Sequence, residues 1–159
     1  MPSRPTKLKA ALHRMKNPSW VCFIWFGLTA GISLLAVPAL FSADAASRPV
    51  NLDIARALFQ ILNKAEFVLL IALLIQLRLA GLAGRFWAYA GVLALIMIAQ
   101  TAWFLPELSS RTDLILAGSE PPPSIAHAGY SVSSLLKLAI LLVAGFAAGG
   151  SRHAEQRLG

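Results

Sequence analysis

Four long apolar blocks alternate with polar links along the chain. The blocks cover about residues 20–41, 58–79, 86–105 and 131–149, and each holds 19 to 22 residues. An α-helix needs about 20 apolar residues to cross a hydrocarbon core of about 30 Å. Because backbone polar groups in lipid must be hydrogen-bonded within their own segment, helices are the expected spanning elements. The pattern therefore predicts an all-α integral membrane protein, a four-helix bundle.

The polar segments are too short to form a second domain. Hydrophobic residues make up 57% of the chain and charged residues only 13%. We therefore predict a single membrane domain over residues 1–159. Residues 1–19 form a basic cytoplasmic tail, and residues 106–130 form the longest link, which is predicted to be an outer loop.

Prolines and a glycine predict local structure in and near this loop. The segment from Ser110 to Asp113 resembles a capping box before an apolar turn that Gly118 ends, which predicts one helical turn at the membrane interface. The three prolines at positions 121–123 predict an extended segment. In the first block, Pro38 predicts a kink.

Much of the net charge of +7 comes from the basic tail, which holds five of the fourteen lysines and arginines. A basic segment directly before a span sets topology and contacts anionic lipid. We therefore predict that the partner of the tail is the lipid bilayer and not nucleic acid. The five residues are Arg4, Lys7, Lys9, Arg14 and Lys16.

Lysine and arginine are distributed unequally between the two sides of the predicted bundle. The tails and the second link carry nine of them, whereas the first and third links carry three. The more basic side faces the cytoplasm, so both termini are predicted to be cytoplasmic. The alanine-rich composition, with more Arg than Lys, is compatible with a bacterial inner membrane.

The first block also resembles a cleavable signal peptide, because it follows a basic start and precedes Ala43-Asp44-Ala45. However, its apolar stretch of about 22 residues is longer than the usual 7 to 15 residues of a signal h-region. We therefore expect this block to be retained as the first span.

Pairs of small residues occur in the first and fourth blocks. Gly27 and Gly31 have the spacing that permits close helix packing, and so do Gly145 and Gly149. The alternative for the first pair is a chance spacing in a span rich in glycine and alanine. If these faces pack between chains, they predict a homo-oligomer or a membrane-protein partner.

Polar side chains inside the blocks are the best indicators of function, because a charge at a helix centre costs about 2.5–3.5 kcal/mol on insertion scales. Asn63 and Lys64 belong to a polar stripe on the second helix, and Glu66 lies beside this stripe. The candidates for an intramembrane polar site are Asn63, Lys64, Glu66, Gln100 and Lys137.

The depths of two of these charges agree. Glu66 lies 12 residues before Arg78, and Lys137 lies 15 residues before Arg152, which correspond to about 18 and 22 Å of helix. We predict that Glu66 and Lys137 form an ion pair within a polar layer that is open to the outside. Gln100 and Ser33 fall at similar depth.

Three interpretations of this layer remain open. The polar residues could fix helix register, or they could line a vestibule for a ligand or ion. In the third interpretation the second span starts deeper, and Lys64 and Glu66 lie at the membrane interface.

No residue pattern predicts a metal site, a cofactor or catalysis. The single cysteine, Cys22, excludes an internal disulfide and a cysteine-based metal cluster. The histidines His13, His127 and His153 have no second ligand at metal-binding spacing. We therefore predict no metal, no cofactor and no enzymatic activity, and a surface position at the membrane edge for His127.

Several short motifs resemble one family. They are the run from Trp25 to Gly31, the run from Val37 to Phe41, Ala57 to Phe59, Glu66, and His127 ahead of the last span. Together they resemble the transmembrane-protein-205-like family of small four-helix membrane proteins of unknown function. The resemblance implies the four-helix architecture. That family is similar in layout to the copper-resistance-protein-D-like proteins, which implies copper or haem, but this chain lacks the intramembrane histidines of such a site.

Three functions compete at this point. The favoured one is a non-catalytic accessory or scaffold subunit. The second is a transporter or channel component that uses the polar layer around Glu66 and Lys137. The third is an enzyme or redox module of the membrane that binds haem, copper, quinone or lipid, with His127 and the outer vestibule as the candidates.

Overall fold

The structure is a computed structural model that describes residues 17–43, 46–82 and 84–158, and these residues contain helices but no strands. The helices are α2 (Ser19–Ala30), α3 (Val37–Ser42), α4 (Arg48–Ala80), α5 (Arg85–Ala99), α6 (Leu105–Leu116) and α7 (Ala126–Leu158). Two π-helical turns, η1 (Gly31–Ala36) and η2 (Gln100–Phe104), join α2 to α3 and α5 to α6.

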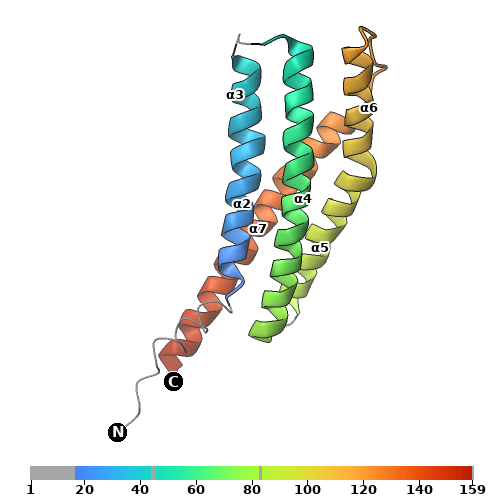
Figure 1. Cartoon of the computed structure of the whole chain (residues 1–159). Coiled ribbons are helices and arrows are strands. Elements are labelled where there is room, and N and C mark those ends of the chain that lie inside the picture. Colours follow the sequence, from blue (N-terminus) through green and yellow to red (C-terminus); the bar gives the residue numbers. More distant parts are fainter. Residues whose placement is uncertain (1–16, 44–45, 83, 159) are drawn as a thin grey trace.

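Four continuous helical stretches are long and apolar enough to cross a membrane, as the four blocks predict. They are Ser19–Ser42, Arg48–Ala80, Arg85–Leu116 and Ala126–Gly150. Sequence neighbours pack side by side, and α7 closes the ring by packing against both α2 and α5. Figure 1 shows α7 crossing behind the other three stretches at a tilt. The arrangement is a four-helix bundle.

The bundle has two ends, which we name by their connections. The terminal end holds the start of α2 and the turn between α4 and α5. At this turn, Gly81 and Gly84 adopt positive φ angles of 65° and 62°, which glycine tolerates without steric cost. The loop end holds the end of α3, the start of α4 and the link at residues 117–125 (Figure 1).

The prediction of an outer loop over residues 106–130 is wrong in extent. Helix α6 continues the third stretch to Leu116, and α7 already begins at Ala126, so the irregular link covers only residues 117–125. The Ser110 hydroxyl donates to the Glu107 carbonyl of the preceding turn, so Ser110 lies inside a helix instead of starting one. Gly118, with φ 76°, ends the helix as predicted.

Each π-turn ends two residues before a proline. Pro38 is the second residue of α3, and Pro106 is the second residue of α6. Proline lacks a backbone N–H and its ring clashes with the carbonyl four residues earlier. A wide turn with an extra residue relieves that clash, so the helix continues where the sequence predicts a kink or an end.

The apolar core lies in the terminal half of the bundle. Its side chains come from the first turns of α2, the last turns of α4, most of α5 and the later part of α7. They are Val21, Cys22, Trp25, Leu70, Leu73, Leu77, Phe86, Ala90, Leu93, Met97, Leu141, Ala144 and Ala148.

The four glycines predicted to pack do not behave alike. A Cβ atom on Gly145 would lie 3.1 Å from the Phe23 ring and 3.3 Å from the Cys22 Cβ, and one on Gly149 would lie 3.6 Å from the Ser19 hydroxyl. These two positions permit close contact between α2 and α7. A Cβ atom on Gly27 or Gly31 would have no neighbour within 4 Å. For contacts within the chain, the prediction of close helix packing at this pair is therefore wrong.

Some predictions lie outside the described residues. They concern most of the basic tail, with His13, and Asp44 and Ala45 of the signal-like sequence. Of α7 beyond Gly150, only the helical backbone is described.

Candidate functional site

A buried ion pair joins the second and fourth helical stretches. The Lys137 ammonium on α7 lies 2.7 Å from the Glu66 carboxylate on α4, and both side chains are fully buried. The predicted pair is therefore confirmed. Removing two charges from water is costly unless their remaining hydrogen bonds are also made, so the surrounding partners decide whether the pair is stable.

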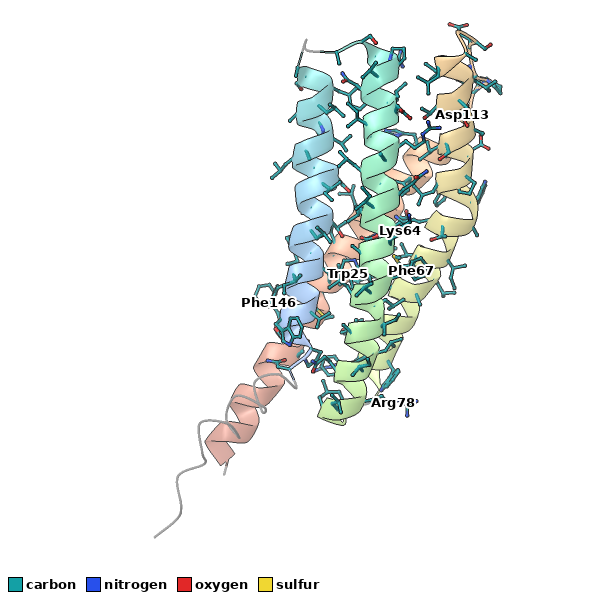
Figure 2. All side chains as sticks on the ribbon, viewed as in Figure 1. Trp25, Lys64, Phe67, Arg78, Asp113 and Phe146 are labelled. Carbon is teal, nitrogen blue, oxygen red and sulfur yellow. The ribbon has the colours of Figure 1, made fainter. Side chains whose placement is uncertain are left out.

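The second oxygen of the Glu66 carboxylate accepts two hydrogen bonds from α2. The Trp25 indole N–H donates over 3.0 Å and the Thr29 hydroxyl over 2.6 Å. Trp25 projects from α2 toward α4 (Figure 2). Sequence reasoning missed both donors, although their i, i+4 spacing places them on one helix face. The carboxylate therefore has a donor on α2 and a cation on α7.

Gln100 connects the pair to the third stretch. Its amide oxygen accepts a hydrogen bond of 2.8 Å from the Lys137 ammonium. Its amide nitrogen donates to the hydroxyls of Ser133 and Ser134 on α7, at 3.0 and 3.1 Å. The network thus takes side chains from all four helical stretches and fixes their relative heights.

The predicted openness of this polar layer is wrong. Glu66, Gln100 and Lys137 have no exposed surface. The Ser33 hydroxyl does not join them and has no hydrogen-bond partner among the described residues. The layer is therefore enclosed within the bundle.

Asn63 and Lys64 do not belong to the network either. The Asn63 amide oxygen accepts a hydrogen bond of 3.1 Å from the Thr101 hydroxyl, whereas its buried amide nitrogen has no partner in the described part of the chain. Lys64 is exposed, and Figure 2 marks its position on α4. Glu66 follows Lys64 by two positions, which is about 200° around a helix. The two charges therefore face opposite directions.

A cavity of about 620 Å³ lies in the loop half, directly beyond the network. Its walls are mainly apolar, with hydroxyl groups and three basic side chains, and no carboxylate lines it. The lining residues are Ser33, Leu34, Val37, Pro38, Phe41, Arg48, Leu52, Phe59, Leu108, Arg111, Thr112, Ile115, His127, Tyr130, Ser131, Ser134, Leu135 and Leu138. A mainly apolar pocket of this size with a few polar groups is typical of small-molecule sites.

Ser134 belongs to both the cavity and the network. Ser134 is one of the lining residues of the cavity, and its hydroxyl accepts a hydrogen bond from Gln100. The side chains of Gln100 and Lys137 then lead to Glu66. The floor of the cavity is therefore held in place by the buried pair, although the carboxylate itself does not reach the cavity.

The chain matches no family model, no curated protein and no solved structure. The resemblance to the transmembrane-protein-205-like family therefore stays a prediction.

His127, which that resemblance singles out, lines the cavity and is exposed. Within the described ranges, no three His, Cys, Asp or Glu side chains group together as metal ligands. The single cysteine, Cys22, is buried in the core and is a free thiol.

Proposed function

We propose that this protein is a multi-pass membrane protein that binds a small molecule in its loop-end cavity without catalysing a reaction on it. The observation that carries the proposal is Ser134, which ties the cavity floor to a fully hydrogen-bonded ion-pair network. Sites that bind ligands need a rigid supporting shell, and this network provides one. The protein would thus act as a non-catalytic accessory component of the membrane.

The apolar outer surface supports the membrane part of the proposal. Large apolar side chains on different helices are well exposed, among them Leu35 at 70%, Leu95 at 67% and Phe146 at 68%. Contact of such a surface with lipid costs no free energy, whereas its contact with water is unfavourable. We further propose the bacterial inner membrane as the location and a cytoplasmic position for both termini, based on the distribution of lysine and arginine.

Transport through Glu66 has less support. A carboxylate that exchanges a proton or cation needs a path to the ligand, but Glu66 is fully buried and holds three partners. The network is better suited to fixing the register of the four helices, because each helical stretch contributes at least one side chain to it. We therefore assign it a supporting role below the binding site.

Filling the cavity tests this proposal. Ser33→Trp places an indole in the cavity, and Leu35→Trp is the matched control because Leu35 lies in the same turn, outside the cavity lining. The probes are palmitate and monopalmitoylglycerol, an anionic and a neutral amphiphile, added to protein in nanodiscs and followed by native mass spectrometry. At least one probe should bind with a stoichiometry of one to the natural chain and to Leu35→Trp, and more weakly to Ser33→Trp. Equal binding by all three proteins would contradict the proposal.

A further inference from the structure

Basic groups gather where the cavity meets the loop end. Arg48, Arg111 and His127 line this part of the cavity, and no acidic side chain is among the lining residues. Arg48 lies in the first turn of α4 and His127 in the first turn of α7. Helix N-termini carry partial positive charge, which adds to the charge of these side chains. The mouth of the cavity therefore favours an anion.

The arginines at this end differ in their partners. Arg56 pairs with Asp53 and Asp113, so its charge is already compensated. Arg48 has no carboxylate within ion-pair distance among the residues described. Arg111 donates to the backbone carbonyl of Pro122, which carries no charge. Two guanidinium groups thus remain able to bind a carboxylate or phosphate, for which their planar donor geometry is suited.

The cavity below these arginines is long and apolar. Along α4 it extends from Arg48 to Phe59, and along α7 from His127 to Leu138. Each interval covers 11 residues, or about 16 Å of helix. The walls in between are largely leucine, valine and phenylalanine side chains. The shape therefore suits a molecule with one charged end and one apolar chain.

The cavity also has a side that faces the membrane. At the loop end, α3 packs against α4 and α7 packs against α6, and α3 and α7 diverge (Figure 1). Leu34 of η1, which leads into α3, and Leu135 of α7 line the cavity, and they are 50% and 55% exposed. An acyl chain could pass between them from the surrounding hydrocarbon without crossing water.

We infer that the cavity binds a single-chain anionic lipid, with its carboxylate or phosphate head on Arg48 and Arg111 and its acyl chain in the gap between α3 and α7. This inference rests on the proposed binding function and specifies its ligand. The lipid would come from the leaflet that surrounds the loop end. Ser33, whose hydroxyl has no partner in the described part of the chain, lies among the residues that the acyl chain would contact.

Charge dependence of binding tests the head group. Native mass spectrometry in nanodiscs compares palmitate, palmitoyl-lysophosphatidylglycerol and neutral monopalmitoylglycerol on the natural chain and on the double variant Arg48→Gln/Arg111→Gln. We expect the anionic probes to bind at least about tenfold more tightly than the neutral one, and the double variant to lose that preference. Arg85→Gln, which removes one charge at the terminal end, should leave all three affinities unchanged.

Thiol protection tests the position of the chain. The variants Leu135→Cys and Leu136→Cys are both exposed on α7, but only position 135 lines the cavity. Palmitate should slow the reaction of Leu135→Cys with a membrane-permeant maleimide and leave Leu136→Cys unaffected. Equal rates with and without palmitate at both positions would contradict a chain in the gap.

The outcomes separate this inference from the function on which it rests. If anionic and neutral probes bind equally and Ser33→Trp weakens the binding of both, the cavity binds ligands but the inferred preference for an anionic head group is wrong. If only one of the two anionic probes shows the preference, the head group is narrowed to carboxylate or phosphate. If no probe responds to Ser33→Trp, both the inference and the proposed function fail.

Discussion

The terminal and loop halves of this bundle are built from the same four helical stretches but packed in different ways. In the terminal half, α2 lies against α7 so closely that the Ser19 hydroxyl donates to the Gly145 carbonyl over 2.7 Å. The Phe23 and Phe146 rings also meet edge to face, with centroids 5.1 Å apart. In the loop half, α3 and α7 diverge around a cavity of about 620 Å³.

The difference shows how a small four-helix bundle can hold a cavity. A cavity in a bundle loses packing contacts, so another part must hold the helices together. Here the terminal core and the Glu66–Lys137 network do so, and the network lies where the two halves meet.

Breaking the ion pair should have the largest effect. Lys137→Met leaves the Glu66 carboxylate buried without its cation, and we expect a loss of about 3–5 kcal/mol in the free energy of unfolding. The double variant Glu66→Gln/Lys137→Met should recover most of that loss. A full charge swap should recover less, because a lysine at position 66 cannot accept the hydrogen bonds from Trp25 and Thr29. Denaturant unfolding in mixed micelles measures all three.

Removing one donor to the carboxylate should have a smaller effect. Thr29→Val deletes the hydroxyl that lies 2.6 Å from the Glu66 oxygen, and hydrogen bonds to charged groups contribute about 1.5–3 kcal/mol. Ser33→Ala is the matched control, because it deletes a hydroxyl one turn later that has no partner in the described residues. The same unfolding assay should show no loss for the control. Equal losses for the two variants would mean that the hydrogen bond from Thr29 to Glu66 contributes nothing measurable to stability.

Tight packing in the terminal half predicts a further loss. Gly145→Leu forces a side chain into the Phe23 ring and the Cys22 side chain, and overpacking costs about 1–3 kcal/mol. Gly27→Leu places the same side chain at an exposed position where the Cβ atom meets no atom within 4 Å, so the monomer should keep its stability. If Gly27→Leu instead disrupts an oligomer in size-exclusion chromatography with light scattering, Gly27 packs between copies of the chain.

The charged contact at the loop end should matter least. Arg56 joins α4 to α6 through Asp113, and the Asp113 side chain is 66% exposed. Exposed ion pairs contribute about 0–1 kcal/mol, so Arg56→Gln should change the free energy of unfolding by less than 1 kcal/mol. A loss as large as that of Lys137→Met would show that the loop end carries more of the stability than its packing indicates.

The sequence predicts the helices and the ion pair because both depend on regular repeats. Helix length follows from apolar block length, and the heights of Glu66 and Lys137 follow from the rise per residue. The sequence does not single out Trp25 and Thr29, because both residue types are ordinary in an apolar span. The prediction for Lys64 is wrong because a stripe of polar residues is wider than the single face that points inward.

The cavity could not be predicted in the same way. It depends on the tilt of α7, and helix tilt is set by the sum of packing contacts with the neighbours. The extent of the third helix could not be predicted from the sequence either, because a proline such as Pro106 is typical of a helix end. The helix continues to Leu116 through the π-turn η2, and the residue pattern does not predict this turn.

That π-turn also sets the angular phase of everything that follows it. One extra residue in a turn rotates later side chains by about 100° relative to an uninterrupted α-helix. Leu108 and Thr112 of α6 line the cavity, and Asp113 of α6 meets Arg56. Deleting a single residue such as Ala102 would keep every lining residue in the chain and yet rotate those of α6 by about 100° relative to the rest of the bundle. The shape of the site is thus encoded by the number of residues in a helix as well as by their identity.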